Sequence, residues 1–295
     1  MLRFSDRLAR AIRAKRSVLV AGVDPHWELL PAELRGGART PAARARAMLK
    51  FSAAVIDRAA PHAAAVKLQI AFFETAGRAG FDAFFKAAAR ARRRGLIVIG
   101  DAKRADIGST SAAYAEAFLS RSSPVDALTV NPYFGADGVL PFRDLAVKNG
   151  KGIFVLVRTT NPGAAAIQLL STPDGAVCEV VARLVREWGA SCVGKAGFSD
   201  VGAVVAANRP AEAARLRKLM PRTFFLVPGY GTQGGTVETV RACFHGDGRG
   251  AIVAVSRSLN FAFRQSPWRE QFGETRWAAA VGASAKALRE ELNRI

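Results

Sequence analysis

Short runs of aliphatic and β-branched residues alternate along the chain with longer, alanine-rich amphipathic segments. Near-continuous apolar runs are typical of strands buried on both faces of a parallel sheet. The predicted strands are Val18–Val23, Ala64–Lys67, Leu96–Asp101, Ala127–Val130, Gly152–Val157, Val201–Ala206, Thr223–Val227 and Ala251–Val255. The predicted helices are Pro41–Ala60, Glu74–Arg94, Ser109–Leu119, Gly138–Lys148, Ala176–Trp188, Ala211–Leu219, Thr236–Cys243 and Thr275–Leu292. Pro162–Gly175 and Arg264–Gly273 are expected to be surface loops.

The order of these units favours one fold class. Eight strand–helix units fit a closed (β/α)8 TIM barrel, whereas an open doubly wound sheet usually carries a glycine-rich phosphate turn after its first strand. The first predicted strand ends instead in Gly22-Val23-Asp24-Pro25-His26. No linker or low-complexity segment interrupts the pattern. We therefore predict an α/β protein in which residues 1–295 form a single TIM-barrel domain.

The net charge of +19 raises the possibility of a nucleic-acid binder. The arginines, however, are scattered through alanine-rich helical segments such as Ala87–Gly95, and no aromatic residues interleave with a basic stripe. This distribution favours solvated helix faces and no nucleic-acid partner. A positive field can still help to attract an anionic substrate.

The cysteines and the apolar runs indicate a protein of the reducing cytoplasm. Cys178, Cys192 and Cys243 are far apart and show no metal-ligand spacing, so we expect free thiols in or near the core. No apolar run approaches the roughly 20 residues that span a bilayer. Val18–Val23 is short and runs into Asp24-Pro25-His26, which excludes a signal peptide in this interpretation and leaves no membrane partner.

Polar residues recur where the predicted strands end, and in a TIM barrel this edge carries the chemistry. The residues are Asp24, Lys67, Asp101 with Lys103, Asn131, Thr160, Gln233 and Arg257. A random surface distribution would not follow the strand ends so regularly. The pattern therefore predicts an enzyme.

The densest of these clusters directly follows the third predicted strand. Alternation along an extended chain places Asp101 and Lys103 on the same side, and Asp106 lies on the next loop. Carboxylates around a lysine keep it charged, which suits a positioned proton donor and not a Schiff-base nucleophile. A solvated salt-bridge loop is the alternative, but an apolar strand leads straight into these charges. Ser109 or Thr110 is expected to cap the following helix.

At this cluster the sequence resembles the orotidine 5′-phosphate decarboxylases, whose signature is D-x-K-x-x-D-I-G-x-T. The string DAKRADIGST matches it at every defined position and resembles the longer bacterial branch of the family. Five further blocks match in order from the first strand to the last: GVDPHWELLP at 22–31, KLQIAFFE at 67–74, RTTNPG at 158–163, PGYGTQGG at 228–235 and SRS at 256–258. The resemblance implies decarboxylation of orotidine 5′-phosphate to UMP in de novo pyrimidine biosynthesis, with no cofactor and no metal.

The resemblance also implies roles for the charged residues. Lys103 is the general acid that protonates C6 of the pyrimidine, within an alternating array with Lys67, Asp101 and Asp106. Asp106 is contributed to the site of the neighbouring subunit, and Thr110 contacts the ribose in that same neighbouring site. The resemblance therefore implies a homodimer. A fixed cation at C6 stabilises the charge that develops there as carbon dioxide leaves.

The remaining substrate contacts follow from the same resemblance. Asp24 binds the ribose hydroxyls, and Ile107 and Pro228 lie among the residues that bind the substrate. Thr160 stands where the family contacts the pyrimidine, although many relatives have Ser at this position.

A phosphate-binding site is predicted in the loops after the seventh and eighth strands, which form the usual anion site of a TIM barrel. Gly229, Gly231, Gly234 and Gly235 surround Gln233, and glycine lets backbone N–H groups approach an anion closely. Arg257 follows the eighth strand and can hold a phosphate in a bidentate manner. By resemblance, Gln233 belongs to a mobile loop that closes on the phosphate.

Two alternatives stay open. Related phosphosugar decarboxylase and aldolase barrels also carry D-x-K-x-x-D but use magnesium, for which they need an additional acidic residue near the second strand. Here Lys67 is followed by Leu68 and Gln69, and Glu74 is well downstream, so activity is expected to survive EDTA. The other alternative is a basic, non-catalytic barrel that binds RNA in a salt-sensitive manner.

Overall fold

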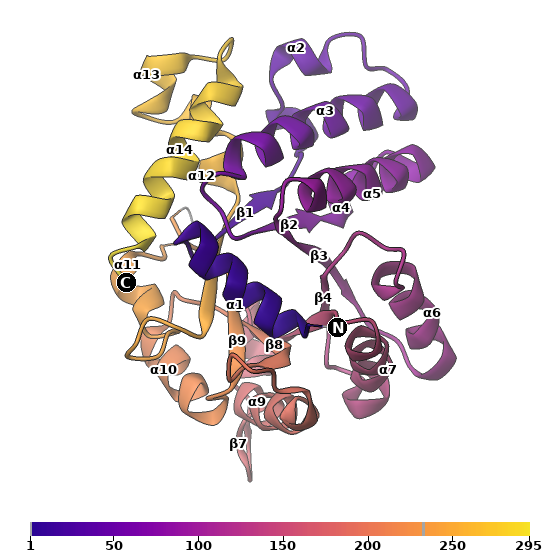
Figure 1. Cartoon of the computed structure of the whole chain (residues 1–295), viewed down its shortest axis with the longest axis vertical. Helices are drawn as coiled ribbons and strands as arrows, with labels where there is room; N and C mark the ends of the chain where they lie inside the picture. Colours follow the sequence, from indigo (N-terminus) through magenta and orange to yellow (C-terminus); the bar gives the residue numbers. More distant parts are fainter. Residues whose placement is uncertain (1, 232–233) are drawn as a thin grey trace. The chain divides into compact units, whose positions relative to one another are not determined.

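The computed structural model describes residues 2–231 and 234–295. Its main strands form one closed parallel barrel in the order β1-β10-β9-β8-β5-β4-β3-β2, which confirms the predicted TIM-barrel class (Figure 1). These strands are β1 (Leu19–Val23), β2 (Ala65–Gln69), β3 (Ile97–Arg104), β4 (Ala127–Val130), β5 (Gly152–Arg158), β8 (Ser199–Val205), β9 (Thr223–Val227) and β10 (Ala251–Val255). Each contains one of the predicted apolar runs or most of it.

The helices that follow the strands agree with the predicted segments and differ mainly at their ends. The larger helices are α1 (Phe4–Lys15), α3 (Pro41–Ala59), α5 (Gly77–Arg93), α6 (Gly108–Leu119), α7 (Gly135–Lys148), α9 (Val177–Trp188), α10 (Pro210–Leu219) and α14 (Trp277–Leu292). The shorter ones are α2 (Ala32–Arg35), α4 (Ile70–Glu74), α8 (Ala165–Gln168), α11 (Val237–Arg241), α12 (Arg257–Asn260) and α13 (Trp268–Phe272). Among these helices, none is both long and apolar enough to cross a membrane, as far as the described residues go.

Two segments expected to be loops contain secondary structure, so that prediction is wrong in both places. Pro162–Gly175 holds α8 and most of a two-stranded antiparallel hairpin, β6 (Ser171–Thr172) and β7 (Gly175–Ala176). The hairpin turn closes through the Thr172 hydroxyl, which donates to the Gly175 carbonyl at 2.7 Å. Figure 1 shows it beside the start of α9. Arg264–Gly273 contains α13.

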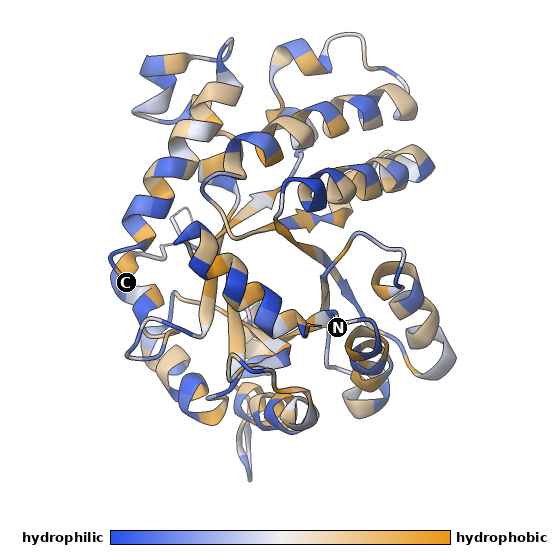
Figure 2. Cartoon of the chain, viewed as in Figure 1, coloured by the Kyte–Doolittle hydropathy of each residue, from blue (hydrophilic) through white to orange (hydrophobic). Residues whose placement is uncertain are grey.

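Internal contacts divide the chain into two compact units, which are described separately. The first unit comprises Met1–Arg10, Lys103–Ala254 and Ile295, and the second comprises Ala11–Ala102 and Val255–Arg294. That residues 1–295 form a single domain therefore stays a prediction. The strands are apolar along most of their length, whereas helices such as α3 and α5 carry polar residues on one side (Figure 2).

In the second unit, aromatic side chains pack α3 against the C-terminal segment. The Thr40 hydroxyl caps α3 by accepting from the N–H of Ala43 at 3.2 Å. Phe51 of α3 is fully buried, and its ring stacks on Phe261 at 5.7 Å and on Trp277 at 5.2 Å between centroids. These contacts bury a large apolar area and fix the segment that follows β10.

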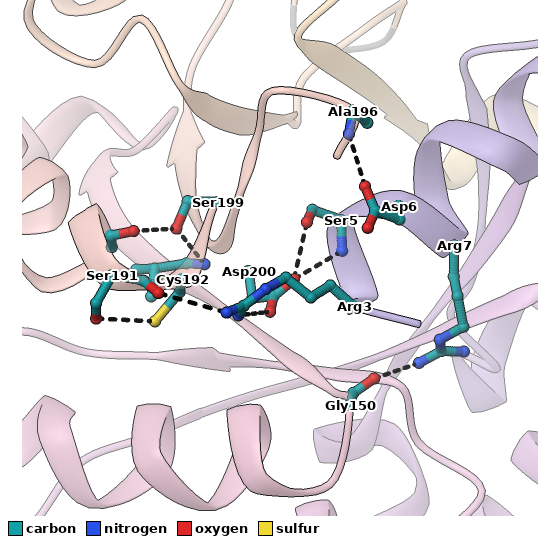
Figure 3. A network of polar contacts seen from close by, with 12 residues as sticks. Arg3, Ser5, Asp6, Arg7, Gly150, Ser191, Cys192, Ala196, Ser199 and Asp200 are labelled. Carbon is teal, nitrogen blue, oxygen red and sulfur yellow. Dashed lines mark hydrogen bonds and ion pairs between the residues drawn. The ribbon is translucent and has the colours of Figure 1, made fainter. Parts of the chain in front are cut away.

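In the first unit, the beginning of the chain is fastened to the start of β8. Backbone N–H and hydroxyl of Ser5 donate to Asp200 Oδ1 at 2.8 and 2.9 Å, and Arg3 donates to Asp200 Oδ2 at 3.1 Å (Figure 3). Arg7 reaches Asp126 Oδ1 at 2.6 Å and the Gly150 carbonyl at 2.9 Å. Burial raises the pKa of Asp200, although Ser5 and Arg3 oppose the shift.

A buried arginine holds the starts of β9 and β10. The guanidinium of Arg217 donates to the carbonyls of Cys243, Met220, Thr223 and Gly250 at 2.8 to 3.1 Å. Burial lowers its pKa to about 10. Because the hydrogen-bond acceptors include the carbonyls of Thr223 and Gly250, these bonds hold the N-terminal ends of β9 and β10.

Candidate active site

A buried ion pair joins β2 and β3 near their C-terminal ends. These strands are parallel neighbours, with Gln69 opposite Asp101. Lys67 Nζ donates to Asp101 Oδ2 at 2.6 Å, and Gln69 Nε2 donates to the same oxygen at 3.1 Å. The side chains of Lys67 and Asp101 are only 10% and 8% exposed. The structure thus brings together two of the charged residues that the sequence singled out.

The charge balance around Lys67 keeps its ammonium protonated. Burial alone lowers the pKa of Lys67, but Asp101 and then Asp24 oppose burial, and the net pKa is raised. Lys67 is therefore a fixed cation between two carboxylates at neutral pH.

Asp24 follows β1, and its backbone is held by Asn260 in the C-terminal segment of the same unit. Its N–H donates to Asn260 Oδ1 at 3.3 Å, and Asn260 Nδ2 donates to the carbonyls of Gly22 and Ser256 at 2.6 and 2.7 Å. A Cβ on Gly22 would lie 1.9 Å from the Ser256 hydroxyl, so only glycine permits this approach. Asp24 Oδ1 is buried and accepts no hydrogen bond from the described residues.

Arg257 begins α12, two residues after β10 ends. Its side chain is exposed, and within residues 2–231 and 234–295 it makes no ion pair or hydrogen bond. An exposed guanidinium directly after a barrel strand is available to an anion.

In the first unit, Lys103 adopts an unusual backbone conformation. Its φ is +47°, in the left-handed region that costs a non-glycine residue roughly 1–2 kcal/mol. Its N–H donates to Thr129 Oγ1 on β4 at 3.0 Å. The prediction that Asp101 and Lys103 share a side assumed an unbroken extended chain, and this assumption is wrong at Lys103. Such strain concentrates at functional sites.

The turn after β3 differs from the predicted helix cap. The helix α6 begins at Gly108, where φ is +51°, and neither Ser109 nor Thr110 caps it. Asp106 instead accepts the N–H of Ile107 at 2.8 Å, and the Ser111 hydroxyl donates to the Asp106 carbonyl at 2.6 Å. The Asp106 carboxylate is thus engaged in its own turn, and Thr110 is exposed.

The loops after β5 and β9 carry the other predicted substrate contacts. Thr160 is half-buried two residues after β5, and Pro228 is half-buried one residue after β9. Gly234 is exposed with a φ of +84°, and its N–H donates to the Gly231 carbonyl at 2.9 Å. Gln233 lies outside the described residues.

Three residues that position the site were missed by the sequence interpretation: Gln69, Thr129 and Asn260. Each acts through a single amide or hydroxyl, and none stands in a charged cluster. Gln69 lies inside the KLQIAFFE block, so its spacing from Lys67 was the one available signal. Asn260 follows the SRS block by two residues, and its contacts depend on a long-range approach that local sequence does not reveal.

Comparison with known proteins identifies the chain. A family model described as "Orotidine 5'-phosphate decarboxylase / HUMPS family" matches residues 18–262. The chain belongs to this family. A curated orotidine 5′-phosphate decarboxylase from Rhodopirellula baltica is 40% identical over 300 residues, with 99% of each chain covered. A second, from Caldicellulosiruptor bescii, is 39% identical and covers 90% of this chain and 91% of its own.

Solved structures of the decarboxylase family agree with the fold. The structure of Leishmania donovani OMP decarboxylase is similar with a TM-score of 0.76 at 32% identity, covering 99% of this chain and 98% of that one. With this family membership, the protein is an enzyme, a carboxy-lyase. The cysteines Cys178, Cys192 and Cys243 are free and buried as expected. A cytoplasmic location stays a prediction.

Proposed function

We propose that the chain decarboxylates orotidine 5′-phosphate to UMP in pyrimidine biosynthesis. The observation that carries this proposal is the buried Lys67–Asp101 pair, whose Asp101 stands two residues before Lys103 within the complete family signature. Family membership supports the reaction type and the pathway. The residue roles that follow are our proposals for this chain.

Lys103 is proposed as the proton donor. The bond between C6 and the carboxylate breaks, carbon dioxide leaves, and the electron pair stays on C6. The ammonium of Lys103 then gives a proton to C6, and water restores the lysine. Lys67 and Asp101 support this step because a fixed pair of opposite charges keeps the local field constant without solvent reorganisation. None of these steps requires a cofactor or a metal.

Asp24 is proposed to bind the ribose hydroxyls. Its buried Oδ1 lacks a donor within the described residues, and a sugar hydroxyl would supply one. Thr160, Ile107 and Pro228 are proposed to contact the substrate around the pyrimidine and ribose. The hydroxyl of Thr160 replaces the serine of many relatives without loss of its hydrogen-bonding capacity.

Arg257 and the loop after β9 are proposed to bind the phosphate. The exposed guanidinium of Arg257 supports this role, as does the positive φ of Gly234, which lets the backbone approach an anion. Gln233 is retained in this role from the sequence alone.

We further propose that the active enzyme is a homodimer in which Asp106 and Thr110 serve the partner's site. Ile107, Tyr114, Tyr133 and Phe134 are all exposed, and Tyr133 is 81% exposed. Of these, Phe134 lies near Asp106, because a Cβ on Gly138 would lie 2.8 Å from the Phe134 side chain and 3.1 Å from the Asp106 carbonyl. An apolar patch beside Asp106 supports a covered surface at this place.

A mixed dimer tests the shared site. Lys103→Ala and Asp106→Ala proteins are each expected to be nearly inactive. In a heterodimer, one site collects both defects and the other collects neither. Random refolding of equal amounts gives about half heterodimers and thus roughly a quarter of wild-type sites. A mixture with no regained activity, while mass spectrometry confirms exchange, would assign Asp106 to its own chain.

The reaction itself is tested by the absorbance of orotidine 5′-phosphate. Purified protein is expected to remove it and to form UMP with equal rates before and after EDTA treatment. Loss of activity with EDTA, and its return with magnesium, would favour the phosphosugar barrels. Salt-sensitive RNA binding without turnover would favour the non-catalytic barrel.

A further inference from the structure

The loop that carries Thr160 is held in place by three side chains. One of them belongs to the RTTNPG block of the loop itself, and the other two lie outside the family blocks. Three residues take part: Arg158 at the end of β5, Gln168 at the end of α8 and Glu212 in the first turn of α10. All lie in the first unit. The proposed chemistry assigns none of them a role.

Arg158 is the centre of this network. Its side chain is 6% exposed, and its Nε donates to Glu212 Oε2 at 2.6 Å. Its Nη1 donates to the Thr159 carbonyl at 3.1 Å and to Gln168 Oε1 at 3.3 Å. The ion pair with Glu212 therefore fixes the guanidinium, which in turn donates to the carbonyl of the peptide bond between Thr159 and Thr160.

Gln168 also binds Thr159. Its Oε1 accepts the N–H of Thr159 at 3.0 Å, and its Nε2 donates to the Thr159 hydroxyl at 2.9 Å. That hydroxyl donates in turn to Asn161 Oδ1 at 2.6 Å. The residues on both sides of Thr160 are thus fixed by a continuous chain of hydrogen bonds.

We propose that Arg158, Gln168 and Glu212 are positioning residues that set Thr160 for its contact with the pyrimidine. This inference rests on the proposed function. A loop residue loses backbone freedom when it is ordered. The network orders Thr160 before substrate binds, so the substrate does not have to order it.

The sharpest variant is Gln168→Leu, which keeps the side-chain size and removes all three hydrogen bonds. It is expected to lower kcat/KM about tenfold. The loss should be equal for orotidine 5′-phosphate and for orotidine, because Thr160 contacts the base and not the phosphate. Gln168→Glu keeps both acceptor contacts and should regain most of the activity. The control is Ile167→Ala, since Ile167 is an exposed neighbour on α8 and should have no effect.

Two outcomes separate positioning from simple stability. If Gln168 acts through Thr160, adding Gln168→Leu to Thr160→Ala should cause no further loss, because the two changes remove the same contact. A structural role alone would lower the melting temperature and leave kcat/KM of the folded protein unchanged. Glu212→Gln, a milder change in a partly exposed side chain, should lower kcat/KM in the same substrate-independent manner.

Independent, multiplied losses in the double variant would overturn the positioning role. So would an unchanged kcat/KM in Gln168→Leu while the wild type is active; both results leave the proposed function intact. A wild type that does not turn over orotidine 5′-phosphate would overturn the proposed function and this inference together.

Discussion

Two buried carboxylates, Asp101 and Asp200, use different partners at opposite ends of barrel strands. Asp101 is the fifth residue of β3 and binds the ammonium of Lys67 at 2.6 Å. Asp200 is the second residue of β8 and binds the N–H and hydroxyl of Ser5 at 2.8 and 2.9 Å. Both side chains are almost inaccessible to solvent. The two carboxylates differ in the chemical nature of their hydrogen-bond donors and in the end of the strand at which they lie.

The donors of Asp101 include the charged ammonium of Lys67, whereas the donors of Asp200 fasten the beginning of the chain to β8. Lys67 keeps a raised pKa because Asp101 and Asp24 oppose the effect of burial, so its ammonium stays charged. Asp200 is held mostly by neutral groups, and burial raises its pKa. In a TIM barrel, the C-terminal strand ends carry chemistry and the N-terminal ends carry stability. The catalytic role proposed for Asp101 and the fastening role of Asp200 would follow this division.

The largest effect is expected when the Asp101 pair is broken. Lys67→Met removes the ammonium and leaves a buried carboxylate without its counter-charge. We expect kcat to fall about a thousandfold or more, or about 4 kcal/mol of barrier, in a protein whose circular dichroism shows a folded state. The matched control is Lys86→Met, which breaks an exposed lysine–aspartate pair with Asp82 on α5. Activity above a tenth of wild type in Lys67→Met would remove this pair from the chemistry.

The second expected loss depends on the substrate. Arg257→Ala should lower kcat/KM for orotidine 5′-phosphate about a hundredfold and leave the reaction of orotidine almost unchanged, because remote binding energy is lost only with the phosphate. Arg264→Ala, at another exposed arginine of the same segment, is the control. Equal losses on both substrates would place Arg257 outside the phosphate site.

At the other carboxylate, stability and not chemistry should change. Asp200→Ala leaves the buried N–H and hydroxyl of Ser5 without an acceptor, which we expect to cost about 3 kcal/mol of unfolding free energy. Urea denaturation measures this loss, and Asp247→Ala at an exposed pair should cost less than about 0.5 kcal/mol. The kcat of the folded fraction should stay within about twofold of wild type. A large fall in kcat would contradict the division between the two ends.

The smallest expected effect concerns pH. Because the folded pKa of Asp200 lies above the ordinary value of 3.8, the stability that this group contributes is complete below that value. It is then lost as pH rises through the folded pKa. Asp200→Asn cannot titrate, so the wild type should lose stability relative to this variant as pH rises above the ordinary value of 3.8. Urea midpoints across this range measure the difference, and a difference that does not vary with pH would show that Asp200 does not titrate in this manner.

The sequence predicted the strands well because strands buried on both faces leave uninterrupted apolar runs, as in Thr223–Val227. It missed α1, although Phe4 and Leu8 share a buried face at helical spacing, because the apolar run of β1 dominated that region. In the segment 162–175, α8 has only four residues and the strands of the β6–β7 hairpin only two each, which is too short for a periodic pattern to reveal them.

The candidate site was predictable where residues cluster in the sequence and not where distant residues meet. Lys67 and Asp101 stand at the ends of two predicted strands, so their meeting could be expected if these strands are parallel neighbours. The contact between Arg158 and Glu212 joins residues that are 54 positions apart, and no local pattern predicts it. The left-handed φ of Lys103 is likewise a property of the folded turn.

Lys103, the proposed proton donor, is the central residue of the proposed mechanism. The most direct measurement compares Lys103→Ala with wild type in two assays: turnover of orotidine 5′-phosphate and equilibrium binding of UMP. We expect turnover to be almost abolished while UMP still binds. If the variant retained more than about a tenth of wild-type turnover, a difference of about 1.4 kcal/mol in barrier, another group would have to supply the proton.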